Sequence, residues 1–212
     1  MKRIVKSPEP EDFREWKEKW RSNELEPGWG EFDTKPIKQA VKQALLKEQG
    51  YICCFCEINV SMDNGHIAHL RDQAGHPKLA LEYDNLFYSC TEQPKTEPQT
   101  SGHAQKNAIL PISPLADDCE SRFLYTMNGK IHPKSDADKD AAETVRILNL
   151  NAKRLAQSRE QAFLEVFNER HERKPDEFQK WIDGELEKID DHFTEFWTVK
   201  KYVSTMPTFV FV

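Results

Sequence analysis

The chain has 212 residues and a formal net charge of −6 at pH 7. A chain of this length can bury one substantial core, or a small metal-stabilised module beside a helical one. The acidic balance excludes a uniformly basic surface, so contact with nucleic acid would need a local basic patch or a second subunit. No apolar run reaches the roughly 20 residues of a membrane span. Because no signal sequence precedes its five cysteines, we expect a soluble, cytoplasmic protein in a reducing compartment.

Residues 1–50 are predicted to form an N-terminal helical region. Phe13, Trp16 and Trp20 recur at steps of three and four residues, as expected for an amphipathic helix with one aromatic face. A Gly-Trp-Gly sequence then interrupts the pattern. Pro36 precedes a second helical pattern, which Gly50 ends. We expect this second helix to lie beside the first cysteines.

Residues 51–133 are predicted to form a module of short strands and turns. Residues 91–102 are rich in Pro, Thr, Gln and Glu and have no hydrophobic period, which predicts a loop inserted into the module. Asn128-Gly129 separates two apolar stretches, and this pair readily supplies the positive φ angles of a type I′ turn. The sequence therefore predicts a β-hairpin at this point.

Residues 134–212 are predicted to form a C-terminal helical region with an apolar tail. The hydrophobic period there is helical almost throughout. Pro175 begins a helix that we expect to run past Ile189 as far as Trp197. The last four residues, 209–212, are all apolar, so they either pack against these helices or dock a larger partner.

Three cysteines of the module predict a structural zinc site. Cys53 and Cys56 have the C-x-x-C spacing that lets two sulfurs reach one tetrahedral metal, and Cys90 is a third ligand. The alternatives are ordinary buried thiols or a redox pair, and no strand-then-helix pattern supports the latter. Ser101-Gly102 stands where a second C-x-x-C would normally be found. The fourth ligand position is therefore open to His103, Cys119 or Cys54.

Two histidines and an asparagine of the module predict phosphodiester hydrolysis. That reaction requires a base that activates water and a cation that stabilises the leaving oxygen. In the order typical of HNH nucleases, His69 would be the base, Asn85 would hold the connecting loop, and His103 would support the metal. Lys106, one helical turn beyond His103, could contact substrate phosphate. His66 is either a second metal ligand or an exposed polar neighbour, and we favour the latter.

Three longer segments carry a resemblance to a known family. Residues 83–90 read YDNLFYSC, Gly102-His103 is followed by Lys106-Asn107, and residues 144–151 read TVRILNLN. These segments are similar to the N-L-x-x-S-C core, the helix entry and the T-I-x-x-L-N-L-N segment of the retron- and Septu-type HNH endonucleases of bacterial anti-phage defence, the PtuB-like subunits. The chain resembles this family over most of its length.

The resemblance implies an α+β fold, in which a zinc-stabilised ββα-metal (HNH) module carries N-terminal helices and a C-terminal helical extension. It also implies an endonuclease effector that acts with a PtuA-type ATPase subunit and, in some systems, with a retron reverse transcriptase and its RNA-DNA hybrid. In the family an acidic residue precedes the catalytic histidine, whereas Ala68 precedes His69 here. We therefore expect weak binding of a catalytic Mg²⁺ or Mn²⁺, unless His66 or Asp72 replaces the carboxylate.

Three functions remain open from the sequence. The first is an HNH endonuclease that uses His69 as the general base. The second is the same fold acting as an RNase on a structured host RNA such as a tRNA, where the 2′-OH can be the nucleophile and Ala68 matters less. The third is a catalytically inactive, zinc-stabilised adaptor, for which His69→Ala would leave function intact.

Overall fold

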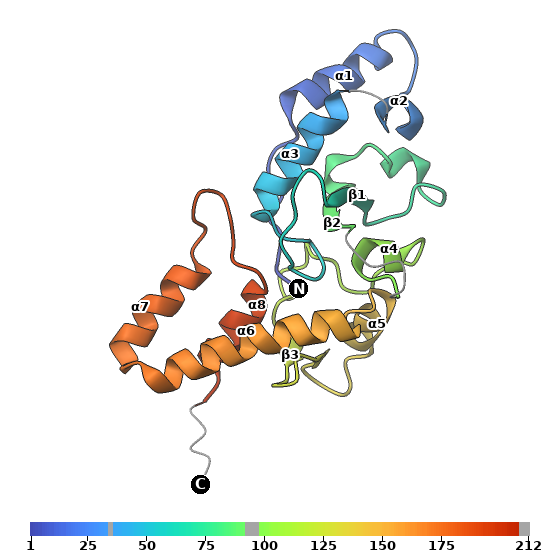
Figure 1. Cartoon of the computed structure of the whole chain (residues 1–212). Helices are drawn as coiled ribbons and strands as arrows, with labels where there is room; N and C mark the ends of the chain where they lie inside the picture. Colours follow the sequence, from blue (N-terminus) through green and yellow to red (C-terminus); the bar gives the residue numbers. More distant parts are fainter. Residues whose placement is uncertain (34–35, 92–97, 208–212) are drawn as a thin grey trace.

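The computed structural model describes residues 1–33, 36–91 and 98–207 (Figure 1). It is a mixed α/β structure with two small antiparallel sheets, β1–β2 and β3–β4. In chain order the elements are α1 Glu11–Arg21, α2 Trp29–Asp33, α3 Ile37–Gln49, β1 Gly65–His69, the 3₁₀ helices η1 Pro77–Leu79 and η2 Tyr83–Asn85, β2 Leu86–Cys90, α4 Ser101–Gln105, β3 Phe123–Tyr125, β4 Ile131–Pro133, α5 Lys139–Ile147, α6 Lys153–Glu172, α7 Pro175–Leu186 and α8 Trp197–Thr205. Part of the predicted loop, residues 92–97, and the apolar tail at 209–212 lie outside the described residues.

Helices α1–α3 lie at one end of the molecule and α6–α8 at the other, with β1, β2 and α4 between them (Figure 1). Buried side chains from all three parts form one continuous hydrophobic core. The buried ammonium group of Met1 links α8 to the residues around the first cysteines, because it pairs with Glu57 at 3.0 Å and lies 3.5 Å from the Thr198 hydroxyl of α8. No helix of the described residues is long and apolar enough to cross a membrane.

The N-terminal helices form as the sequence predicts. Phe13 of α1 is buried, and its ring lies 5.2 Å from that of Phe32. Helix α3 ends at Gly50, whose φ of 66° is left-handed and whose Cβ, if present, would lie 2.2 Å from the Phe193 ring. Helix α2 was not predicted, because five residues that include a glycine are too few to show a hydrophobic period.

The β1–β2 hairpin is the scaffold of both candidate sites. Gly65 pairs with Cys90 at one end and His69 with Leu86 at the other. Every residue of β2 is buried, because α3 covers one side of the strand and α4 another. The Gln49 amide at the end of α3 accepts a bond from Tyr88 N (2.7 Å) and donates one to Tyr88 O (2.8 Å), which satisfies the backbone of β2 beyond the hairpin.

The predicted β3–β4 hairpin is confirmed, with Tyr125 opposite Ile131, but the predicted turn type is wrong. A type I′ turn needs positive φ at both central residues. Gly129 is left-handed at 70°, whereas Asn128 is not. The five-residue loop is closed by a bond from Thr126 N to Lys130 O (3.0 Å). A Cβ on Gly129 would lie 1.8 Å from a backbone oxygen of α6, so the loop is shaped by packing on that helix.

The predicted continuation of the Pro175 helix to Trp197 is wrong. Helix α7 ends at Leu186, and Ile189, expected on its apolar face, is 59% exposed. The chain then turns through Asp190 and Asp191, both with positive φ. Phe193 N donates to Gly50 O at 2.9 Å. Phe193 thus keeps the helical spacing of apolar residues, but it packs against Gly50 at the end of α3. A new helix, α8, begins at Trp197.

Candidate functional site

The sulfurs of Cys53, Cys56 and Cys90 all lie within 4.8 Å of one another, and all three residues are buried. Cys56 Sγ lies 3.7 Å from Cys90 Sγ. The C-x-x-C turn is closed by a bond from Glu57 N to Cys53 O (3.1 Å), with Glu57 in the left-handed region at 64°. Cys90, at the end of β2, donates its backbone N–H to Cys53 Sγ at 3.4 Å. This cysteine cluster could hold a metal ion such as zinc.

The three thiols of the cysteine cluster affect one another's ionisation. Burial alone would raise the pKa of Cys53, but hydrogen bonds from the neighbouring thiols lower it well below its ordinary value. Burial raises the pKa of Cys56 well above its ordinary value, and the hydrogen bond to Cys53 raises that of Cys90. One sulfur is thus stabilised as a thiolate at the expense of the others. A metal ion would allow all three to ionise together.

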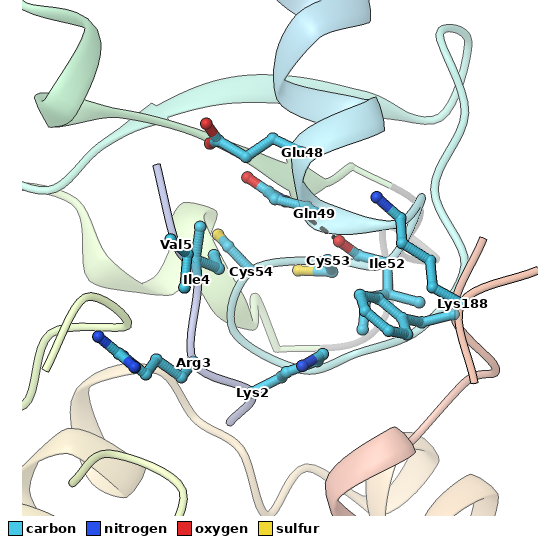
Figure 2. Close-up of a pocket in the computed structure, with 11 residues that line it drawn as sticks. Lys2, Arg3, Ile4, Val5, Glu48, Gln49, Ile52, Cys53, Cys54 and Lys188 are labelled. Atoms are coloured by element: carbon cyan, nitrogen blue, oxygen red, sulfur yellow. Dashed lines mark hydrogen bonds between the residues drawn. The ribbon is translucent and has the colours of Figure 1, made fainter. Parts of the chain in front are cut away.

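The candidates for a fourth ligand do not join the cysteine cluster. Cys54 lies beside Cys53 and lines a cavity of about 150 Å³ together with Ile4 and Glu48 (Figure 2). Cys119 lies elsewhere, where its thiol donates to the carbonyl oxygens of Met1 and Pro114 at 3.8 Å. His103 packs against another histidine, described below. Within the described residues, no histidine, further cysteine or acidic side chain joins the three cysteines of the cluster.

His69 ends strand β1 with both ring nitrogens in defined surroundings. Nε2 lies 3.0 Å from Ala80 O, and because a carbonyl oxygen only accepts, Nε2 carries the proton. Nδ1 is therefore the basic nitrogen, and its lone pair accepts a hydrogen bond from the Gln73 amide nitrogen at 3.3 Å. The Trp29 ring lies edge-on, 4.5 Å between centroids. Burial lowers the pKa of His69, so its imidazole is neutral and basic at neutral pH.

Asn85 ties together both ends of the loop between β1 and β2. Its Oδ1 accepts from Arg71 N at 2.7 Å, and its Nδ2 donates to Arg71 O (3.0 Å) and Leu79 O (2.9 Å). Gln105 adds a second support, because its amide donates to the backbone oxygens of His69 (3.3 Å) and Leu70 (3.2 Å). The loop that carries Ala80 and Gln73 is thereby fixed against His69.

His66 and His103 form a pair beside His69, with ring centroids 4.2 Å apart. The expectation that His66 is an exposed neighbour is wrong: it is half-buried, and α4 covers it. Burial lowers the pKa of His66 to about 4, so its imidazole is neutral. Its Nδ1 is buried and has no hydrogen-bond partner within the described part of the chain. Ala68 lies on the same face of β1, and a Cβ on Gly102 would approach both His66 Nε2 (3.0 Å) and Ala68 Cβ (3.1 Å).

An open cleft of about 310 Å³ joins these groups. It is lined by His66 and His69 of β1, by Gln73 and by Lys106. Lys106 is exposed on the rim, at the residue that ends α4. The structure thus brings His66, His69 and Lys106 to one polar hollow, which we call the histidine cleft, with His103 against its wall. Asn85 holds the loop between β1 and β2 and does not line the histidine cleft.

Sequence reasoning missed Trp29, Gln73, Ala80 and Gln105, which position His69. Ala80 acts through its backbone and Trp29 comes from a distant helix, so no sequence signal marks either. Gln105 alone could have been noticed, because it is a polar residue on the short helix that carries His103.

Two known proteins are similar to this chain in sequence. No family model matches the chain. A Vibrio cholerae (serotype O1 biovar El Tor) protein named "Retron Vc95 putative HNH endonuclease" is 31% identical over 126 residues, which are 56% of this chain and 61% of that protein. An Escherichia coli protein named "Retron Ec83 putative HNH endonuclease" is 25% identical over 220 aligned positions, 82% of this chain and 83% of the relative.

The resemblance to retron-type HNH endonucleases is confirmed. The alignment with the Vibrio relative spans 61% of that protein's length.

Proposed function

We propose that this chain is an HNH endonuclease effector of a retron- or Septu-type anti-phage defence complex, and that His69 is the general base. The observation that carries the proposal is the fixed protonation of His69: Nε2 is held by Ala80 O, which leaves Nδ1 as the basic nitrogen beside an open polar cleft. The two retron relatives support the nuclease reading by their names.

The residues around His69 hold the base in position to deprotonate a water molecule that replaces Gln73 at Nδ1. Gln105 and Asn85 fix the backbone from His69 into the loop that follows it, and Trp29 restricts the ring. A general base must be neutral to accept the proton and correctly oriented to do so in the transition state. Lys106 on the rim is placed to contact a substrate phosphate.

A divalent cation in such a site would polarise the phosphate and stabilise the leaving oxygen. The methyl group of Ala68 offers no ligand, whereas His66 and His103 offer two imidazoles. Imidazole suits transition metals, and Mg²⁺ prefers oxygen ligands. The residues present therefore fit Mn²⁺ better than Mg²⁺, with His66 and His103 as its holders.

We assign β1, β2 and α4 to a ββα-metal module within residues 51–133, held together by zinc at Cys53, Cys56 and Cys90. The helical regions 1–50 and 134–212 flank it. The order of the two strands and the helix supports this assignment, as does α4 packing on β2. Three buried cysteines whose sulfurs lie within 4.8 Å of one another are a ligand set that zinc prefers.

The acidic net charge favours an effector to which other subunits deliver the substrate. We propose a PtuA-type ATPase as that partner, with a retron reverse transcriptase and its RNA-DNA hybrid in retron systems. Docking would use the C-terminal helical region and the tail at 209–212, which lies outside the described residues.

A second candidate is an RNase that cleaves structured RNA such as a tRNA. The absence of an acidic ligand at Ala68 favours it, because attack by the ribose 2′-OH needs a base more than a metal. The third candidate is an inactive zinc-stabilised adaptor. The hydrogen bonds that orient both ring nitrogens of His69 disfavour it, because an adaptor does not need an oriented histidine.

The test is to incubate the purified chain, alone and with the products of its neighbouring genes, with labelled DNA and with total RNA, and to map the new ends. DNA ends that depend on His69 support the endonuclease. A 2′,3′-cyclic phosphate on RNA supports the RNase. No difference between the wild-type chain and a parallel preparation of His69→Ala would leave only the adaptor, because any cleavage common to both comes from a contaminant.

A further inference from the structure

The cysteine cluster supplies three sulfurs, whereas zinc in a closed structural site takes four ligands in a tetrahedron. A fourth protein ligand must therefore come from a residue outside the His, Cys and acidic groups, or the position is left to solvent. The three cysteines are buried, with exposed fractions of 1%, 7% and 1% for Cys53, Cys56 and Cys90. Solvent has little access, and a neighbouring side chain is the better source.

Ser101, the first residue of α4, is the candidate for the fourth ligand. Its exposed fraction is 0%, and its Oγ is buried without a hydrogen-bond partner among the described residues. Buried hydroxyl groups are almost always partnered, so an orphan of this kind points to a ligand. The next residue, Gly102, donates its N–H to Ser89 Oγ at 3.0 Å, and this oxygen lies 3.6 Å from Cys53 Sγ, so the start of α4 lies beside the cysteine cluster.

The backbone at Ser101 is shaped for this role. Its φ is 54°, in the left-handed region that a residue with a side chain rarely adopts. A bond from Ser101 N to Leu148 O (2.9 Å) holds the residue there. This conformation costs free energy in a residue that carries a side chain. A functional requirement on the Ser101 side chain explains why the chain accepts it.

Ser89 is the alternative oxygen ligand, but its hydroxyl, unlike that of Ser101, already has a hydrogen-bond partner. Its Oγ lies 3.6 Å from Cys53 Sγ, but it already accepts a hydrogen bond from Gly102 N at 3.0 Å. Cys54, Cys119 and His103 lie outside the cluster, as described above. Ser101 is thus the buried hydroxyl at the cluster that still lacks a partner within the described residues.

We propose that Ser101 Oγ is the fourth ligand of a three-thiolate, one-oxygen metal site. The neutral hydroxyl binds through a lone pair, and the three thiols release their protons when the metal binds. The metal then fastens the start of α4 to the C-x-x-C turn. Because Gln105 at the end of α4 holds the backbone of His69, the metal also stabilises the histidine cleft through this helix.

The experiment uses Co²⁺ as a spectroscopic probe in the full-length chain, since thiolate-to-cobalt charge transfer grows with the number of sulfur ligands. The wild-type spectrum should show tetrahedral coordination with three thiolates. Ser101→Cys should add a fourth thiolate and tighten zinc binding about tenfold or more in competition with a chelator, as changes at metal sites commonly do. Ser89→Cys is the matched comparison, and a fourth thiolate gained there but not in Ser101→Cys would assign the position to Ser89 and overturn the proposal.

Three other outcomes would also overturn the proposal. The first is a wild-type spectrum with four thiolates, which needs no variant to fold. The second is a folded Ser101→Cys protein with unchanged charge transfer and zinc affinity. The third is a Cys54→Ser or His103→Ala spectrum that shows the loss of a ligand. These readouts are independent of cleavage, so the proposed nuclease function stands or falls separately.

Discussion

The two ends of the β1–β2 hairpin carry sites of opposite character. At the Gly65–Cys90 end, the cysteine cluster is buried and closely packed. At the His69–Leu86 end, the histidine cleft is open and polar, and His69, which we propose as the base, is positioned by residues from other elements. Under the proposed function, one hairpin joins a stabilising metal site to a catalytic one. Damage to the first should therefore reach the second, whereas damage to the second should stay local.

The largest expected effect is that of metal removal. Chelation should destabilise the chain by several kcal/mol and abolish cleavage, because a structural metal contributes its binding energy to folding. Thermal melting with and without chelator, together with metal analysis, measures this. Cys90→Ser should reproduce the loss, and Cys119→Ala, a buried cysteine outside the cluster, should keep its response to chelator. Less than about a tenth of an equivalent of zinc in protein purified without chelators would contradict the account.

Asn85→Ala should damage both stability and cleavage, but without loss of metal. It removes three hydrogen bonds that tie the loop beneath His69 and leaves buried backbone groups unpaired. Unpaired buried groups cost roughly 1–3 kcal/mol each. Melting, cleavage and metal content should be measured on the same preparation. A variant that melts lower yet cleaves at the wild-type rate would show that the loop does not position His69.

Trp29→Ala should slow cleavage by about tenfold, which corresponds to the roughly 1 kcal/mol of an aromatic contact. The indole lies against the His69 ring and restricts its orientation. Trp20→Ala is the control, because Trp20 packs against Trp16 on α1. Equal rates for the two variants would remove Trp29 from the site.

The smallest effect is a shift of the pH profile. Burial lowers the pKa of His69 below its ordinary value of 6.5, so the neutral base persists to a lower pH than an exposed histidine would allow. The rate should hold as pH falls to 6.5 and then decrease through the lowered pKa of His69. An apparent pKa above 7 for kcat/KM would mean that another group is the base.

Features that depend on neighbours in sequence were predictable, and features that depend on distant packing were not. The spacing of Cys53 and Cys56 marks a metal knuckle, and Gly50 ends α3 as its conformational freedom suggests. The end of α7 could not be predicted, because Phe193 keeps helical spacing but bonds to Gly50. The surroundings of His69 combine a carbonyl oxygen from the connecting loop with a ring from α2, and neither leaves a mark in the sequence.

The most direct test of the account is single-turnover cleavage by His69→Ala. We predict a rate about 10²- to 10⁴-fold below wild type, as for loss of a general base. Melting temperature and metal content should be unchanged, because His69 lies at the open end of the hairpin. His132→Ala, an exposed histidine on β4, should cleave normally. Full activity in His69→Ala would contradict the assignment of the base and leave the adaptor as the better description of this chain.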